Sequence, residues 1–298
     1  MTASVEIDET TVLLFPGQGV SLADAREPVI ECCPSLFERC CELLDADPFE
    51  RASQSTRFAQ PAIFLAGIAA YSQLQERHPL ALAGHSLGEL SALAAAGVFE
   101  LDDALALVVL RGALMADAAE RQGNGGMLAI LKGTPGDARE LSAAHGVQIA
   151  NDNAPGQTIL SGPRSALDAV AADAREHGLR AMRLDVTGAF HSPAMQSACA
   201  PFLDALAGMT TAPPRAPVYS GMTAAPFRDL RAELAQALVR PVRWRETMLA
   251  LYAAGARRFL DVGPDKVLAR LVARNLQGVE GFAMIDYAGE EAVDGIHA

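Results

Sequence analysis

The pattern of apolar and polar positions predicts a chain that alternates short buried strands with helices. Continuous apolar runs indicate strands at residues 11–15, 80–84, 218–220 and 258–262. Apolar residues recur with the helical period over residues 28–44, 61–75 and 101–119, and prolines at positions 28 and 61 fit the first turn of the first two helices. Later helices are expected at residues 230–238, at 245–254, from about 193 and after 266.

The character of the chain changes after the glycine-rich loop at residues 123–126. Extended segments are expected at 127–132, 147–151, 157–161 and 180–186, with helices at 134–145 and 165–177 between them. The order β-α-β-β-α-β is that of a small split βαβ domain. We therefore expect residues 125–189 to form a small domain inserted into a large one made of residues 1–124 and 190–298.

The stretch from Gly84 to Gly88 carries the first chemical signal. It reads Gly-His-Ser-Leu-Gly, lies between a predicted strand and an Ala/Leu-rich helix, and fits the pattern G-x-S-x-G. Glycines on both sides permit a tight turn that exposes the Ser86 hydroxyl, and the helix that follows directs unpaired N–H groups toward it. An ordinary turn can share this pattern, but the flanking strand and helix favour a nucleophile that forms an oxyanion.

A nucleophilic serine needs a base, and the six histidines of the chain are the candidates. His85 adjoins the serine, but neighbouring side chains diverge in a tight turn. His78, His145, His177 and His297 lie at a strand start, at two helix ends and in the tail. His191 remains, in a Gly-Ala-Phe-His turn, where a histidine taken alone is more often structural than catalytic.

Arg111 lies on the apolar face of the helix predicted over residues 101–119. It follows Leu107 by four positions and Ala104 by seven, which places all three on one stripe. An arginine on a buried face is costly unless it is paired. Two interpretations remain open: a structural salt bridge, or a guanidinium that receives a ligand carboxylate in a cleft.

Composition narrows the choice of partners. The 298 residues carry a formal net charge of −12, which argues against nucleic acid and against an anionic membrane surface as partners. Residues 215–274 nevertheless hold eleven Lys/Arg against five Asp/Glu, which fits either a solvated face or a landing surface for an acidic partner. The chain contains no apolar run of eighteen residues and no signal-peptide pattern, and we expect a cytoplasmic protein.

The five cysteines are compatible with a cytoplasmic location. Two adjacent pairs and a single Cys199 have no histidine near them at ligand-like spacing, so we expect buried free thiols and no metal site.

A series of motifs resembles one family, and it covers residues 11–275 in order. The motifs are Phe15-Pro-Gly-Gln18-Gly, Gln60-Pro-Ala, Gly84-His-Ser86-Leu-Gly-Glu, Arg111-Gly, Gly126-Met-Leu-Ala, Asn153-Ala-Pro-Gly-Gln, Gly188-Ala-Phe-His191-Ser, Pro241-Val-Arg-Trp244 and Asp261-Val-Gly-Pro264. They resemble those of malonyl-CoA:acyl-carrier-protein transacylases and of the discrete and modular acyltransferases of polyketide synthases.

The resemblance implies an α/β fold, with an α/β-hydrolase-like large domain interrupted by a ferredoxin-like small one. It implies transfer of a malonyl group from malonyl-CoA to the phosphopantetheine thiol of an acyl carrier protein, through an acyl-Ser86 intermediate, in fatty acid or polyketide biosynthesis. Coenzyme A would enter only as the thioester substrate, without a bound cofactor. We expect a monomer.

The resemblance also implies roles for single residues. Ser86 would be the nucleophile, His191 the general base and then acid, and a backbone carbonyl near Ala237 the group that orients the imidazole. The backbone N–H groups of Gln18 and Leu87 would form the oxyanion hole, and Arg111 would hold the malonyl carboxylate. Further pocket residues by resemblance are Gln60, His85, Met115, Met127 and Phe190, of which Phe190 would disfavour α-branched acyl groups.

Two departures from the family pattern affect the entrance. Val20-Ser21-Leu22 replaces the usual residues after Gln18-Gly19, and Asp265 replaces a usual glycine, with little effect expected on the chemistry. Carrier docking is expected on the basic stretch, at Arg243 and Arg270. Two alternative functions remain at this point: an editing hydrolase of acyl thioesters, and the malonyl-loading subunit of a malonate decarboxylase.

Overall fold

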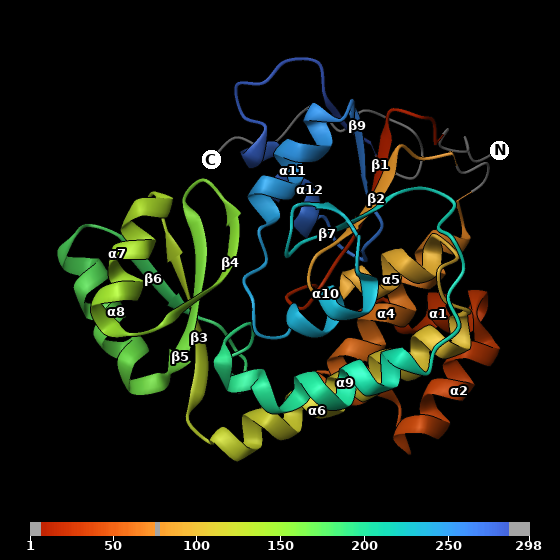
Figure 1. Ribbon diagram of the computed structural model, residues 1–298, viewed down its shortest axis with the longest axis horizontal. Coiled ribbons are helices and arrows are strands. Elements are labelled where there is room, and N and C mark those ends of the chain that lie inside the picture. Colours follow the sequence, from red (N-terminus) through yellow and green to blue (C-terminus); the bar gives the residue numbers. More distant parts are fainter. Residues whose placement is uncertain (1–6, 75–77, 286–298) are drawn as a thin grey trace.

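A six-stranded sheet forms the centre of the larger part of the molecule in the computed structural model, which describes residues 7–74 and 78–285 (Figure 1). Its spatial order is β10-β9-β1-β2-β7-β8, and all neighbours are parallel except β7 and β8. The strands are β1 (Thr11–Phe15), β2 (Ala81–Gly84), β7 (Val218–Ser220), β8 (Ala225–Pro226), β9 (Arg258–Asp261) and β10 (Ala283–Ile285).

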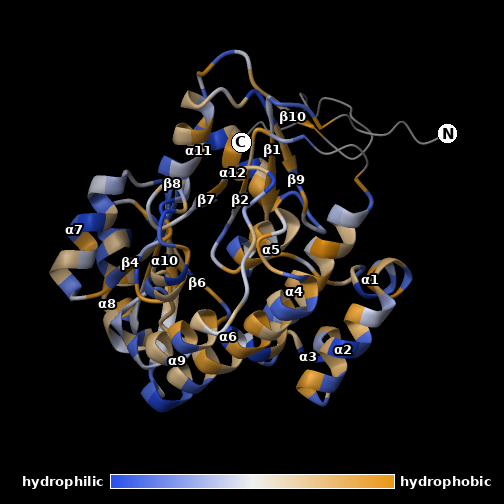
Figure 2. Cartoon of the chain, turned by 45° about the vertical axis from the view of Figure 1, so that its right-hand side comes forward, coloured by the Kyte–Doolittle hydropathy of each residue, from blue (hydrophilic) through white to orange (hydrophobic). Residues whose placement is uncertain are grey.

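Helices cover both faces of this sheet, as the fully buried sequence of β1 requires. Leu13 and Phe15 point to one core, shared with helices from the first half of the chain, while Val12 and Leu14 point to a second core around Trp244. The helices are α1 (Arg26–Cys32), α2 (Pro34–Leu44), α3 (Pro48–Arg51), α4 (Thr56–Ser72), α5 (Gly88–Ala95), α6 (Leu101–Gln122), α9 (Gln196–Ala207), α10 (Leu230–Gln236), α11 (Trp244–Ala253) and α12 (Val267–Asn275), with a short 3₁₀ turn at Pro193–Met195. In Figure 2 the strands β1 and β10 carry hydrophobic colours, in keeping with this burial.

The second sheet has four antiparallel strands in the order β4-β5-β3-β6. It forms the part of the molecule drawn in green at the left of Figure 1, with both of its helices packed on one face. Its elements are β3 (Gly125–Leu131), α7 (Pro135–His145), β4 (Gln148–Ala154), β5 (Gln157–Pro163), α8 (Arg164–Glu176) and β6 (Arg180–Arg183). The prediction of an α/β protein with a ferredoxin-like insertion is confirmed.

The chain enters and leaves the small sheet at one place. A Cβ atom added to Gly125 would lie 2.7 Å from the backbone nitrogen of Ala189, so the two crossing segments touch there. At its other end the small sheet is joined to the large part by hydrogen bonds from Val242 to Ala150 and from Asp152 to Val242, and by the ion pair of Arg245 with Asp152 at 2.7 Å.

Two of the predicted helices differ in extent from the structure. The helix expected over residues 28–44 is broken at Cys33, because Pro34 begins a new helix. The helix expected to start at Pro61 instead begins at Thr56, where the Ser55 hydroxyl accepts a hydrogen bond from the backbone N–H of Arg57. Pro61 therefore lies inside α4, and since that helix is buried over most of its length, tertiary packing outweighs the lost backbone hydrogen bond.

The cysteines are free thiols, as expected, but only Cys40 is buried. Cys32, Cys33, Cys41 and Cys199 are partly exposed, so the expectation of complete burial is wrong for these four. Within residues 7–74 and 78–285, no helix has the length and apolar character needed to cross a membrane.

Candidate active site

Ser86 lies in a strained turn between β2 and α5. Its φ angle is +55°, in the left-handed region that residues with a side chain seldom adopt. A Cβ atom on Gly84 would lie 1.9 Å from the backbone of Gly88, and one on Gly88 would lie 2.1 Å from the carbonyl oxygen of Phe15. Both flanking glycines are therefore required by close backbone packing, which holds the serine at the end of the sheet.

His191 meets this serine from a turn 105 residues further along the chain, also with a positive φ of +56°. Its Nε2 lies 2.8 Å from the Ser86 Oγ. Its Nδ1 lies 2.8 Å from the carbonyl oxygen of Ala237 and 3.2 Å from that of Arg240. Because carbonyl oxygens only accept, the proton resides on Nδ1, and Nε2 is left to accept the proton of Ser86.

The buried imidazole is neutral at physiological pH. Burial lowers the pKa of His191 to about 4, and the charge of Arg111 lowers it further in the same direction. A neutral imidazole can act as a base, so the state of His191 suits the removal of a proton from Ser86.

Arg111 approaches the same serine from α6 and is 4% exposed. One guanidinium nitrogen, Nη2, donates to Ser86 Oγ at 3.2 Å, and Nη1 donates to Gln60 Oε1 at 2.6 Å. Among the described residues Arg111 forms no ion pair, so the interpretation that it belongs to a structural salt bridge is wrong. Burial lowers the pKa of Arg111 to about 10, which leaves a charged guanidinium beside the nucleophile.

Glu89 is a buried acid near this charge and was not predicted from the sequence as part of the site. Its Oε1 accepts a hydrogen bond from the backbone N–H of Gly221 at 2.6 Å, and its side chain is 3% exposed. Burial raises the pKa of Glu89 to about 7, although the Gly221 bond and the field of Arg111 act in the opposite direction.

Two backbone N–H groups at the turn have no partner within the described residues. These are the N–H groups of Gln18 and Leu87, and neither donates a hydrogen bond there. A Cβ on Gly17 would lie 2.3 Å from the carbonyl oxygen of His85, so the loop that carries Gln18 passes directly over the serine turn.

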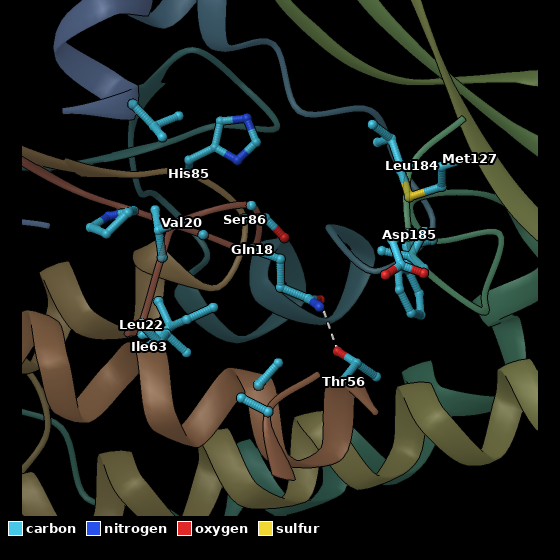
Figure 3. A pocket seen from close by; sticks show the side chains of 18 of the residues that line it. Gln18, Val20, Leu22, Thr56, Ile63, His85, Ser86, Met127, Leu184 and Asp185 are labelled. Carbon is cyan, nitrogen blue, oxygen red and sulfur yellow. Dashed lines mark hydrogen bonds between the residues drawn. The ribbon is translucent and has the colours of Figure 1, made fainter. Parts of the chain in front are cut away.

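A cavity of about 840 Å³ opens over Ser86 and His191. Figure 3 shows Val20, Leu22 and Ile63 gathered on one side of Ser86, and Met127, Leu184 and Asp185 on the opposite side. Of the pocket residues expected by resemblance, His85, Met115, Met127 and Phe190 line this cavity. Gln60 does not line it; it lies completely buried between Arg111 and Thr56.

His85 is turned away from the nucleophile. Its Nε2 lies 2.8 Å from Asn153 Oδ1 on β4, and its ring stands edge-on to Trp244 at 5.3 Å between centroids. Asn153 was seen in the sequence only as part of a motif. Since it is 68 residues from His85, only the fold reveals this contact between the two sheets.

Thr56 is a further residue of the site that the sequence did not single out. Its hydroxyl joins the side chains of Gln18 and Gln60 at 2.8 Å each. The only local signal is its place after the helix-capping Ser55, which says nothing about a partner 38 residues earlier in the chain.

The two departures from the family pattern meet at the entrance. Asp265 Oδ2 accepts a hydrogen bond from the backbone N–H of Ser21 at 2.9 Å, and Val20 and Leu22 on either side of Ser21 line the cavity. Asp265 thus holds the altered loop in place instead of acting only as a turn residue.

Most cations of the basic stretch are already engaged. Arg243 forms an ion pair with Glu246 and donates to the carbonyl oxygens of Met222 and Thr223. Within the described residues, the side chains of four exposed cations of this stretch form no hydrogen bond and no ion pair: Arg228, Arg240, Lys266 and Arg270. Lys266 and Arg270 flank Val267 and Leu268, which line the cavity.

Comparisons with known proteins identify the family of the chain. The family model described as acyl transferase domain matches residues 16–294. The chain is 34% identical over 295 residues to the malonyl CoA-acyl carrier protein transacylase of Bacillus subtilis, covering 92% of each protein. It is also 34% identical over 296 residues to the polyketide biosynthesis protein ThaF of Burkholderia thailandensis, where 93% of this chain spans only 25% of that longer protein.

Solved structures give the same result. The malonyl-CoA:acyl carrier protein transacylase of Xanthomonas oryzae matches with a TM-score of 0.85 at 33% identity, over 95% of both chains. A type II polyketide synthase acyl carrier protein in complex with its malonyl-transacylase matches with a TM-score of 0.82 at 30% identity, over 93% of this chain and 95% of that one. On the domain match, these relatives and the shared fold, the chain belongs to the acyl transferase domain family.

Proposed function

We propose that this protein transfers a malonyl group from malonyl-CoA to the phosphopantetheine thiol of an acyl carrier protein. The relatives named malonyl transacylases support this substrate and partner. The observation that carries the proposal is Arg111: a buried guanidinium 3.2 Å from the Ser86 hydroxyl, without a carboxylate partner in the described part of the chain. A dicarboxylic thioester would supply that missing carboxylate.

The first half of the reaction forms an ester on Ser86. His191 Nε2 takes the hydroxyl proton while Oγ attacks the thioester carbon, and the oxyanion is stabilised by the N–H groups of Gln18 and Leu87. Collapse of this intermediate breaks the C–S bond, and the coenzyme A thiolate leaves with the proton held by His191. The carbonyl of Ala237 keeps the imidazole in the tautomer that this step needs.

The second half reverses these roles. The carrier thiol gives its proton to His191 and attacks the ester, and the proton then returns to Ser86 Oγ as the C–O bond breaks. Nucleophile, base and oxyanion donors all come from the chain, so the proposed steps need no bound cofactor.

The malonyl carboxylate would also strengthen the base. The charge of Arg111 lowers the pKa of His191, and a carboxylate bound to Arg111 would offset that charge. The imidazole would therefore accept a proton more readily when a malonyl group is bound.

The domain division belongs to the same proposal. We place the large domain at residues 1–124 and 190–298, of which 1–6, 75–77 and 286–298 lie outside the described residues, and the small domain at 125–189. The contact of Gly125 with Ala189 and the separate small sheet support these boundaries. Free thiols support a reducing, cytoplasmic location.

Labelling tests the function directly. Purified protein is mixed with radiolabelled malonyl-CoA, quenched in acid and digested, and we expect the label on the peptide that contains Ser86. Addition of a phosphopantetheinylated carrier protein should move the label to the carrier. A Ser86→Ala variant that is labelled and active like the wild type would refute the proposal.

The same experiment distinguishes the alternatives. An editing hydrolase would lose the label to water at the same rate with and without carrier protein. A malonate decarboxylase subunit would transfer the group efficiently only in the presence of sister subunits. Three of the proteins reported above are named as malonyl transacylases, and these names favour neither alternative.

A further inference from the structure

Thr56 connects two parts of the site that come from distant segments of the chain. It is the first residue of α4, is 5% exposed and lies against the cavity. On one side its hydroxyl lies 2.8 Å from Gln18 Oε1, a contact drawn as the dashed line in Figure 3. On the other side it lies 2.8 Å from Gln60 Nε2, and Gln60 contacts Arg111.

The directions of the first two hydrogen bonds in this row follow from Arg111. A guanidinium only donates, so the oxygen of the Gln60 amide must face it and the Gln60 nitrogen must face Thr56. The Thr56 oxygen accepts from that nitrogen, and its own hydrogen is donated to Gln18 Oε1, an amide oxygen that can only accept. Gln18 accepts through Oε1, so its side chain is held by the Thr56 hydroxyl.

We propose that Thr56 is a positioning residue that fixes Gln18, and with it the backbone N–H proposed to stabilise the oxyanion. Only a group that donates and accepts at once can occupy this point in the row, and a hydroxyl does so in little space. Gln18 is itself exposed and lies in a loop, so it depends on this buried partner for a fixed position. The inference rests on the proposed function for its substrate but not for its geometry.

The role has a specific kinetic consequence. Loss of an oxyanion donor lowers the rate of the chemical step by about 10²–10³-fold in serine hydrolases. Thr56 contacts only the side chain of Gln18, so its loss should displace the backbone donor without removing it, and the effect should be smaller. We expect Thr56→Val, which keeps the shape and removes both hydrogen bonds, to lower the rate of Ser86 acylation about 10-fold with little change in the KM for malonyl-CoA. Thr56→Ser, which keeps the hydroxyl, should stay within about twofold of the wild type.

The experiment uses two reagents on the full chain. One is malonyl-CoA, followed as single-turnover acylation, and the other is a fluorophosphonate, whose phosphoryl oxygen occupies the oxyanion position when Ser86 is modified. Thr247→Val is the matched control: it removes the hydroxyl of a fully buried threonine that donates to the Arg243 carbonyl oxygen, away from the cavity. It should alter thermal stability to a similar extent and leave both rates unchanged.

The outcomes separate the inference from the proposed function. A wild-type protein that reacts with the phosphonate but is not labelled by malonyl-CoA refutes the function, while a slow Thr56→Val reaction with the phosphonate still supports the positioning role. Equal phosphonate rates for Thr56→Val and the wild type overturn the inference, as does a loss in Thr56→Ser equal to that in Thr56→Val. If Thr56→Val does not fold, Gln18→Met removes the same acceptor from an exposed loop and must show the same 10-fold loss.

Discussion

The floor and the rim of the cavity are built in opposite ways. The floor consists of Ser86, His191 and Thr56, which line the cavity, and of Gln60 and Arg111, which lie buried directly behind them. Their side chains form one continuous row of hydrogen bonds from Gln18 to the Ala237 carbonyl oxygen. The rim consists of residues 20–22, 184–187 and Asp265, which lie largely in loops and are partly or fully exposed.

This difference separates chemistry from recognition. Floor residues are restrained by buried partners, so a change at one of them leaves another polar group unsatisfied in a dry environment. Rim residues contact solvent, and a change there alters what enters at little cost to the fold. Substitutions in the floor should therefore have large effects that depend on the acyl group, and substitutions in the rim should have small effects that depend on the partner.

The largest effect tests the floor. Arg111→Ala should lower kcat/KM for malonyl transfer about 100-fold, because a charge-assisted carboxylate contact in a buried site is lost. Acetyl transfer, which lacks that carboxylate, should change by less than about threefold, as measured with paired acyl-CoA assays. Arg57→Ala is the control, since Arg57 is paired with Asp117 away from the nucleophile; equal losses of malonyl and acetyl transfer would contradict the assignment.

Phe190 tests the wall next to the floor. It is buried beside His191 and lines the cavity. Phe190→Ala should raise the ratio of methylmalonyl to malonyl kcat/KM about 10-fold, since one methyl group is worth about 1–3 kcal/mol in a pocket. The ratio is measured on a single preparation, so a reduced folded fraction cancels. An unchanged ratio would show that another residue selects the acyl group.

The buried Glu89 should make the free energy of unfolding depend on pH. Its folded pKa of about 7 lies above the usual value of 4.5, so the folded state binds the proton more tightly, and the resulting stability is present at low pH and lost as the pH rises from about 4.5 to 7. Glu89→Gln removes this dependence and keeps an acceptor for Gly221. The free energy of unfolding of the variant minus that of the wild type should increase by about 1 kcal/mol per pH unit between pH 5 and 7.

Urea unfolding at pH 5, 6 and 7 measures this difference. The comparison with the wild type is needed because the lowered pKa of His191 acts on stability with the opposite sign over pH 4–6.5. A constant difference across the three pH values would show that Glu89 is ionised throughout.

The smallest effect belongs to the rim. Arg270→Glu should raise the apparent KM for the carrier protein about threefold at low salt, with kcat unchanged, because the exposed cation would contact an acidic partner. Arg139→Glu, on the outer helix α7, changes the net charge equally and should have no effect. Arg243 is less informative, since its pairing with Glu246 would be broken at the same time. Identical carrier KM values for Arg270→Glu and the wild type would reject this docking surface.

Sequence patterns predicted the elements that depend on local periodicity. The strand at residues 11–15, the helix that carries Arg111 and the order of the inserted small domain follow from burial on fixed faces. The start of α4 was misplaced because Pro61 signals a first turn locally, whereas the buried surroundings of the helix tolerate it in the interior. The strands β8 and β10 were not predicted, and β8, with two residues, is too short to show any periodicity.

The candidate site was predictable only where a motif names its members. Ser86 follows from its glycines, and the family resemblance pointed to His191 and Arg111. Thr56, Glu89 and Asn153 lie in the site because the fold brings segments 38, 132 and 68 residues apart into contact. Such contacts leave no local pattern in the sequence. Thr56 starts a helix, Glu89 lies in a helix and Asn153 lies in a strand, and none of these places indicates a distant partner.

The contact of Gly125 with Ala189 brings the two ends of the proposed small domain to one point. If the intervening residues were exchanged for a related module, the chain that holds Ser86 and Arg111 would keep its course. One wall of the cavity, with Met127 and Leu184, belongs to the exchangeable part or its connection. A replacement module would have to keep the groups that meet the large part: Asp152 for Arg245, Asn153 for His85, and Gln157 for Arg274.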